Sequence, residues 1–201
     1  GLGGSATNAA GAGMAQALGY SLRDVNEREL PFGGFALARL DYIDALKVRQ
    51  GIRHVEMVGA CDVDNPLCGP NGASYVYGPQ KGAEPATCAL LDDALRHFGE
   101  YVKAEFKLDV IDMPRAGAAG GLGAGLVVFC AAELRSGFEV VAEAIGLSDR
   151  IARADLVITG EGRLDDQSLR GKAPAGVARM ANELGVPCWA IAGPTTNLGD
   201  S

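Results

Sequence analysis

The sequence lacks the features that would place the protein in a membrane or on a nucleic acid. No apolar run approaches the roughly 20 residues that a helix needs to cross a bilayer, and no signal peptide is visible. Lys and Arg occur singly and the formal net charge is −7, whereas a protein that binds nucleic acid normally carries a basic face. We therefore expect a cytoplasmic protein that has neither a membrane nor a nucleic acid as its partner.

Histidine and cysteine are too few and too irregularly spaced for a zinc site or a disulfide framework. The chain has 2 histidines, and no two cysteines stand in the CxxC spacing of a zinc ligand pair. The number of cysteines is odd, and we expect all of them to be reduced, as is usual in the cytosol. They are Cys61, Cys68, Cys88, Cys130 and Cys188.

Glycine, in contrast, is abundant. The 29 glycines among 201 residues are roughly twice the average frequency, and they cluster in short loops without a collagen-like period. Such clusters are typical of tight turns and of backbone that approaches a ligand closely. The length suffices for one domain and part of another. Both ends read as cut, because the chain opens on a glycine-rich motif and stops soon after a strand-like segment.

The hydrophobic pattern predicts an α/β protein with a domain boundary near residue 150. In the first 150 residues, we expect Ser5 to cap a helix that extends over residues 6–18. A stripe of apolar residues predicts a second helix over 87–106, and a short apolar run predicts a buried strand over 55–60. A Gly/Ala loop over 114–125 precedes a further helix over 126–134.

Residues 151–201 follow a different pattern. Short helical pieces over 138–145 and 148–154 lead to a strand over 155–159, a helix over 174–184 and a second strand over 188–192. A strand, a loop, a helix and another strand within about 40 residues form a βαβ unit, which implies a parallel sheet.

The first candidate site is the stretch of residues 1–8 (GLGGSATN). Glycines that lead into a capped helix expose N–H groups at the positive end of the helix dipole, which suits a phosphate or a carboxylate. The stretch also fits a loose dinucleotide fingerprint, although no strand precedes it. A plain turn at the start of a helix is the structural alternative.

Residues 61–67 (CDVDNPL) and 78–82 (GPQKG) are the second and third candidates. Asp62 and Asp64 follow a strand at a spacing of two, so both carboxylates can point the same way and bind a metal ion or a hydroxylated substrate. Lys81 on a glycine-flanked turn is a usual phosphate contact. The alternatives are an Asx turn closed by proline and a solvated surface lysine.

Two further loops complete the set of candidates. Ordering the glycine-rich residues 116–125 (AGAAGGLGAG) on folding costs considerable backbone entropy. A loop that surrounds a ligand explains so many glycines better than a plain turn does. Residues 159–168 (TGEGRLDDQS), followed by Gly171 and Lys172, lie where open parallel sheets bind ligands. Phosphoryl transfer needs such a mixture of cations and carboxylates, although an ordinary charged surface loop has a similar composition.

Taken together, four stretches of the chain resemble the glycerate kinase family of the bacterial two-domain type. They are residues 3–8, residues 61–70 continuing to 78–82, residues 117–123 and residues 159–165. The resemblance implies two different α/β domains. Residues 1–150 would be an inserted domain like a restriction endonuclease, and residues 151–201 would be a returning βαβ segment of a flavodoxin-like domain.

The resemblance also implies a kinase that uses ATP and Mg²⁺ to phosphorylate D-glycerate, giving 2-phosphoglycerate or 3-phosphoglycerate. A homo-oligomer is compatible with it. Asp62 and Asp64 would bind the metal or substrate hydroxyls, Arg163 would neutralise charge in the transition state, and Asp165 would orient the attacking hydroxyl. Phosphates or the glycerate carboxylate would contact the residues Gly3, Gly4, Ser5, Asn8, Lys81, Gly120, Gly121, Glu161, Ser168 and Lys172.

One position departs from the family's pattern in a way that bears on function. After the Ser-Ala-Thr-Asn sequence the family generally carries Asp, and this chain has Ala9. The competing hypothesis is therefore a non-catalytic family member or truncated domain that binds a nucleotide or a sugar acid. An oxidoreductase is disfavoured, because no strand-borne fingerprint with a later acidic residue is present.

Overall fold

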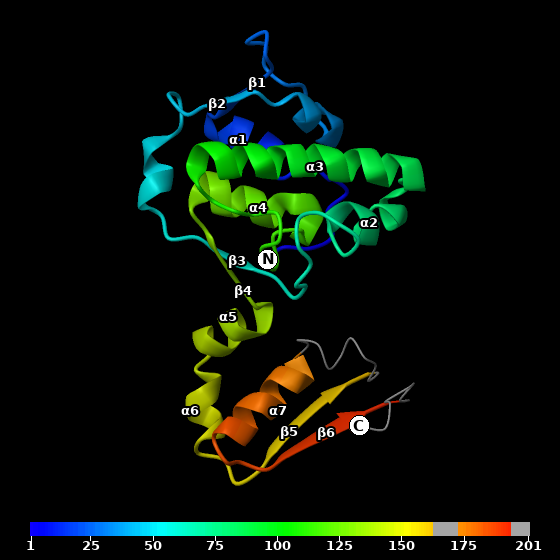
Figure 1. Cartoon of the computed structure of the whole chain (residues 1–201). Helices are drawn as coiled ribbons and strands as arrows, with labels where there is room; N and C mark the ends of the chain where they lie inside the picture. Colours follow the sequence, from blue (N-terminus) through cyan, green and yellow to red (C-terminus); the bar gives the residue numbers. More distant parts are fainter. Residues whose placement is uncertain (163–172, 194–201) are drawn as a thin grey trace. The chain divides into compact units, whose positions relative to one another are not determined.

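The structure, a computed structural model, describes residues 1–162 and 173–193 (Figure 1). The chain forms two compact units, Gly1–Leu134 and Arg135–Ser201. Both units combine helices with short strands, which confirms the predicted α/β class. The predicted boundary near residue 150 lies inside the second unit, because α5 (Gly137–Ala144) and α6 (Leu147–Ile151) pack with α7 (Ala173–Glu183). The restriction-endonuclease-like and flavodoxin-like descriptions stay predictions.

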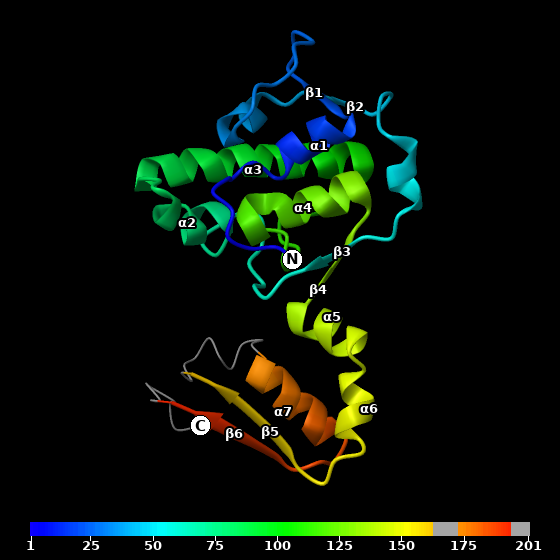
Figure 2. The same cartoon turned by 180° about the vertical axis from the view of Figure 1, so that it is seen from behind.

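The first unit is built around α3 (Pro85–Phe106) and α4 (Ala118–Cys130), which lie beside α1 (Ala12–Leu18) in both views (Figures 1 and 2). In the predicted apolar stripe of α3, Leu95, Phe98 and Val102 are buried in the core, whereas Phe106 at the end of the helix is 49% exposed. The Phe98 ring packs 6.0 Å from the ring of Phe129 on α4. The helix begins two residues earlier than predicted, because Pro85 is well suited to the first helical turn.

Shorter elements surround these helices. They are α2 (Ala73–Tyr77), the 3-10 helices η1 (Gly34–Arg39), η2 (Gln50–His54) and η3 (Pro79–Lys81), and four three-residue strands. The strands are β1 (Ser21–Arg23), antiparallel to β2 (Tyr42–Asp44), and β3 (Val58–Ala60), paired with β4 (Glu133–Arg135). The predicted strand over 55–60 is thus confirmed over its second half.

The predicted start of the first helix is wrong. The helix begins at Ala12, and Ser5 does not cap it but donates a hydrogen bond to the Thr7 carbonyl oxygen, 3.4 Å away. Ala10 and Gly11 have φ angles of 46° and 70°, which break the helical path. The amides of Ala9 and Ala10 instead donate to a carbonyl of another segment, Gly120. A tertiary contact therefore replaces the first helical turns that local propensity favours.

The Gly/Ala segment is also helical earlier than predicted. α4 begins at Ala118, with three left-handed residues at 119–121, and ends at Cys130, so that β4 occupies part of the predicted helix over 126–134. Added Cβ atoms at Gly123 and Gly125 would collide with the carbonyl oxygens of Arg115 and Ala10. These two glycines thus allow segments of backbone to pack closely. From composition alone, this role cannot be distinguished from ligand binding.

The second unit contains the predicted βαβ arrangement. β5 (Val157–Glu161) is parallel to β6 (Cys188–Ala192), with Val157 opposite Cys188 and Glu161 opposite Ala192. α7 packs against both strands. Figure 1 shows α7 alongside the two strands, with α5 and α6 preceding them in the chain. The parallel sheet that the sequence predicts is therefore confirmed.

Among the helices in the part of the chain that the structure describes, none combines the length and the apolar character that a bilayer crossing requires.

Candidate functional site

The glycine-rich segment at the start of the chain rests on the N-terminal end of α4. The amides of Ala9 and Ala10 donate to the Gly120 carbonyl oxygen at 3.1 and 3.2 Å. Gly120 has a φ of 71°, and a Cβ at this position would collide with the Thr7 carbonyl oxygen. Two of the predicted loops, separated by more than 100 residues in the sequence, thus meet backbone to backbone. Glycine is required at this contact both for its conformation and for the space.

Lys81 connects a third predicted motif to the same place. Its amine donates hydrogen bonds to the Thr7 carbonyl oxygen at 2.7 Å and to Ser5 Oγ at 3.2 Å. Partial burial lowers the pKa of the Lys81 amine. The structure thus brings Ser5, Lys81 and Gly120 together through Thr7. Gly121 follows within the left-handed turn and has a φ of 85°.

Asn8 has one polar atom without a partner. Its amide nitrogen donates to the hydroxyl of the fully buried Ser74 at 2.8 Å. Its Oδ1 atom is buried and, among the described residues, accepts no hydrogen bond. Because the Ser74 hydroxyl can donate as well as accept, Asn8 can present either end of its amide to a ligand. Gly3 and Gly4 precede this position, and Cβ atoms at both would meet only open space.

The two aspartates of the second motif lie on an exposed loop beside these residues. Asp64 forms an ion pair with Arg115 at 3.0 Å, and its side chain is nevertheless largely exposed. Asp62 is exposed as well. The Gly117 amide donates to the Asn65 carbonyl oxygen at 3.0 Å, which fixes the loop to the start of α4. All four motifs of the first unit are therefore connected by direct hydrogen bonds.

The aspartates do not form a metal cage by themselves. Within residues 1–162 and 173–193, no group of three or more His, Cys, Asp or Glu side chains could hold a metal ion. Magnesium often takes only one or two carboxylates from the protein and completes its shell with water and substrate phosphates. The donor set at Asp62 and Asp64 therefore fits a magnesium ion that arrives with a nucleotide, and does not fit a permanent structural site.

A cavity of about 550 Å³ opens beside Lys81 and Asn8. Thr7 and Ala9 also line it. The remainder of the lining is mainly apolar and includes Phe32, Phe35 and Leu91. Phe32 and Phe35 are not among the residues that the motifs predicted. The Phe-Gly-Gly-Phe order over residues 32–35 was the available signal, since it places two aromatics around a glycine break.

Comparison with known proteins identifies the family. A family model described as "Glycerate kinase family" matches residues 1–200. The chain belongs to the glycerate kinase family. This result confirms the resemblance that the four motifs predict.

Several glycerate kinases are similar to this family member over nearly all of its length. The glycerate 2-kinase of Escherichia coli K12 is 50% identical over 197 residues, which are 98% of this chain and 52% of that protein. The glycerate kinase of Halalkalibacterium halodurans is 51% identical over 193 residues, covering 96% of this chain and 51% of the relative. The chain therefore spans about half the length of these curated relatives.

A solved glycerate kinase-family structure has the same fold. A crystal structure from Salmonella typhimurium LT2, described as a candidate glycerate kinase 2, superposes with a TM-score of 0.84 at 47% identity. The match covers 96% of this chain and 51% of that one. At this level of identity the backbone arrangement of the motifs is shared over the matched region.

The fifth motif of this glycerate kinase-family chain lies in the second unit. Glu161 is half-buried at the C-terminal end of β5, where a parallel sheet commonly binds its ligand. Arg163, Asp165, Ser168 and Lys172 lie outside the described residues. Their predicted roles stay predictions.

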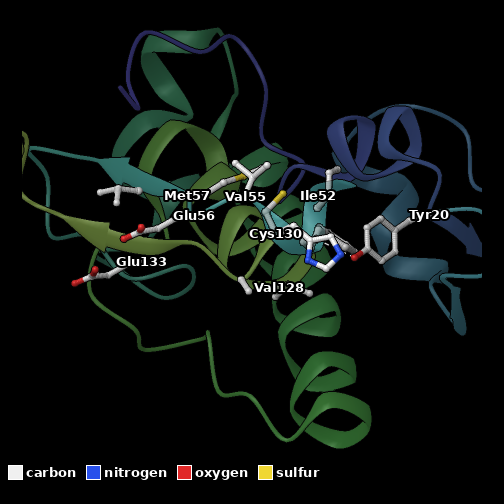
Figure 3. A pocket seen from close by; sticks show the side chains of 12 residues that line it. Tyr20, Ile52, Val55, Glu56, Met57, Val128, Cys130 and Glu133 are labelled. Carbon is white, nitrogen blue, oxygen red and sulfur yellow. Dashed lines mark hydrogen bonds between the residues drawn. The ribbon is translucent and has the colours of Figure 1, made fainter. Parts of the chain in front are cut away.

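A second cavity of about 520 Å³ lies elsewhere in the first unit and was not predicted (Figure 3). It is bordered by η2, by the segment that leads into β3 and by the C-terminal end of α4. Tyr20 closes one side and donates a hydrogen bond to the Phe129 carbonyl oxygen at 2.8 Å. Figure 3 shows Glu56 and Glu133 well away from Tyr20. None of the glycine-rich motifs lines this cavity, so it is separate from the candidate site.

Proposed function

We propose that the complete protein transfers the γ-phosphate of ATP to a hydroxyl of D-glycerate and yields 2-phosphoglycerate. The observation that carries this proposal is the position of Lys81, whose amine lies at Thr7 and Ser5 beside the cavity. Ser5 and Thr7 of the first motif contact this cation directly, and the Thr7 carbonyl in turn lies against Gly120 of the Gly/Ala segment. The names of the relatives support both the reaction class and glycerate as the acceptor.

The residues around Lys81 suit the recognition of an anion. A lysine amine attracts phosphate or carboxylate as a point charge, and the open backbone at Gly3 and Gly4 leaves room for close approach. Ser5 and Asn8 would add hydrogen bonds from side chains that the fold already holds in place. Their role is to bind and orient a substrate, so that the reacting oxygen and phosphorus meet in line.

Residues of the second unit would complete the chemistry. We propose that Arg163 neutralises charge on the transferring phosphoryl group and that Asp165 orients the attacking hydroxyl. Glu161, Ser168 and Lys172 would bind phosphate or substrate. Magnesium, which neutralises charge on the phosphates when bound, would be held by Asp62 and Asp64 together with the nucleotide. A cytoplasmic location and a homo-oligomer belong to the same proposal.

The test is a coupled assay of ADP release by the complete protein with ATP, Mg²⁺ and D-glycerate. We expect glycerate-dependent turnover, and we expect Lys81→Met to lower kcat/KM by at least a hundredfold, because a charged hydrogen-bond donor at the phosphates is lost (about 3 kcal/mol). Lys107→Met is the matched control. Lys107 directly follows the C-terminal end of α3, and within the described part of the chain its amine donates a hydrogen bond to the Ala104 carbonyl oxygen. Equal activity of Lys81→Met and Lys107→Met would refute the role of Lys81.

A second candidate function has one specific observation in its favour. Ala9 lines the cavity at the position where the family generally carries Asp, so the cavity lacks a carboxylate there. A protein without this group could bind a nucleotide or sugar acid and fail to turn it over. The same assay distinguishes the two functions. If the parent protein releases no ADP and Ala9→Asp does, the parent is a binding protein that lost catalysis. Turnover in the parent protein excludes this second candidate.

A further inference from the structure

The cavity beside Lys81 is lined by two chemically different groups of residues. Lys81, Asn8 and Thr7 are polar. Phe32, Phe35 and Leu91 are large and apolar. Such a division suits a ligand with a charged part and a flat apolar part, and the volume of about 550 Å³ lies within the range of pockets for nucleotide-sized ligands.

Phe32 and Phe35 are unusually exposed for large aromatic side chains. Their exposed fractions are 84% and 53%, although neighbouring residues of η1, Ala36 and Leu37, are buried in the core. Leaving two phenyl rings in water forgoes the free energy that their burial would provide. A pair of exposed aromatics that lines a cavity is typical of a surface that a ligand covers.

The loop that carries these rings is fixed to the candidate site. Gly34, between the two phenylalanines, packs so closely that an added Cβ would collide with the Asn8 carbonyl oxygen and would lie 2.8 Å from Leu91 Cδ2. On its other side, Phe32 lies near Gly13 at the start of α1, 3.9 Å from where a Cβ would stand. The segment that carries Phe32 and Phe35 is therefore fixed against Asn8, and the neighbouring Thr7 carbonyl accepts a hydrogen bond from Lys81.

We propose that this cavity is the nucleotide subsite, in which the purine ring of ATP stacks on Phe32 and Phe35 and the phosphates extend to Lys81. The inference rests on the proposed function. It adds that, of the two anionic substrates ATP and glycerate, the cavity beside Lys81 binds ATP. Every nucleobase offers an aromatic face for stacking, and a lysine is a usual contact of the phosphates.

Glycerate fits the same cavity poorly. It is a three-carbon acid that carries two hydroxyls, so nearly all of its surface is polar. Placing it against Phe32, Phe35 and Leu91 would remove its polar groups from water without a partner, which costs free energy. A mainly apolar lining is therefore a reason to assign the cavity to the nucleotide and glycerate to another place.

Calorimetric titration of the complete protein with the non-hydrolysable analogue AMPPNP and Mg²⁺ tests the assignment. The double variant Phe32→Ser/Phe35→Ser removes both rings, and we expect its Kd to rise roughly ten- to a hundredfold, as base stacking on an aromatic ring predicts. Phe32→Tyr/Phe35→Tyr keeps the ring faces and should bind AMPPNP within a few-fold of the parent protein. Leu46→Ser is the control, since Leu46 is 90% exposed and does not line the cavity.

Binding of inorganic tripolyphosphate separates the contribution of Lys81 from that of the two aromatic rings. Tripolyphosphate has the phosphates and lacks the base, so we expect the double serine variant to bind it as tightly as the parent protein does. Lys81→Met should weaken both tripolyphosphate and AMPPNP. Loss of tripolyphosphate binding in the serine variant would contradict stacking as the cause and overturn the assignment. Unfolding temperatures are compared first, because all substituted rings are exposed and the variants should remain folded.

The outcomes for the subsite and for the kinase activity are independent. Glycerate-dependent ADP release together with an unchanged AMPPNP affinity in the serine variant would overturn the subsite and leave the proposed function standing. Ring-dependent AMPPNP binding without turnover would support the subsite and refute the kinase. The double serine variant could also keep the AMPPNP affinity of the parent protein and differ from it in sedimentation coefficient. That result would assign the two rings to a contact between protein chains, and it also overturns the subsite.

Discussion

At the scale of single residues, Cys68 illustrates how burial in this fold controls ionisation. Its side chain is buried next to the carboxylate of Asp92, and burial, followed by that negative charge, raises the pKa of the thiol to about 12. Asp92 itself accepts hydrogen bonds from the Gly69 amide and forms an ion pair with Arg96. It therefore fixes the loop after Cys68 and has a structural role that its charge alone does not reveal.

This shift predicts a loss of stability at alkaline pH. A thiol whose pKa is raised by folding stabilises the folded state below its unfolded pKa of about 9, and that contribution is lost as the pH rises from 9 towards 12. We expect the free energy of unfolding, measured in urea at pH 8 to 11, to fall less steeply with pH in Cys68→Ala than in the parent chain. The two slopes should differ by up to about 1.4 kcal/mol per pH unit. Cys188→Ala, in the second unit, is the control. Identical slopes for Cys68→Ala and the parent chain would contradict this account.

Residue types near the cavity were predictable from sequence, and their partners were not. The glycine-flanked turn drew attention to Lys81, and its role as a phosphate contact stays a prediction. Its contacts with Ser5 and Thr7 join positions more than 70 residues apart, which no local pattern encodes. Phe32 and Phe35 were missed for a related reason, since the Phe-Gly-Gly-Phe order is visible in the sequence but does not show that both rings line a cavity together with Lys81.

At the scale of elements, helices with a clear apolar period were predicted well and glycine-rich segments were not. The stripe on α3 and the βαβ pattern around α7 depend on burial of one face, which the sequence displays directly. The starts of α1 and α4 depend on each other. Hydrogen bonds to Gly120 replace the first helical turns expected for residues 6–11, and local propensity cannot foresee such a competitor.

This mutual dependence predicts that Gly120→Ala destabilises the first unit strongly. The added Cβ would collide with the Thr7 carbonyl oxygen and occupy a left-handed conformation, for an expected loss of about 2–4 kcal/mol in the free energy of unfolding. Gly82→Ala is the matched control. Gly82 is also left-handed, with a φ of 88°, but has open space around it, so only about 1 kcal/mol should be lost. Equal losses in urea unfolding would show that the contact with Thr7 is unimportant.

At the scale of the whole molecule, the sheet of the second unit has one face without cover among the described residues. α7 packs against the sheet, while Ile158, Trp189 and Ile191 are 61%, 64% and 65% exposed. In the parallel register Ile158 stands opposite Trp189 and Gly160 opposite Ile191, so these side chains share one face. Parallel sheets are normally buried on both faces, and a contiguous apolar patch of this kind marks a surface for association.

We therefore expect the 201-residue chain to self-associate through this face. Trp189 is the only tryptophan of the chain, so its emission reports directly on the patch. With rising concentration, the sedimentation coefficient should increase and the emission should shift to the blue in the same range, because the indole leaves water. Trp189→Phe/Ile191→Lys should remain monomeric, since a charge would be buried at the interface. Val25→Lys/Leu46→Lys, on exposed apolar residues of the first unit, should associate like the parent chain. Association that persists in Trp189→Phe/Ile191→Lys would place the contact on another surface.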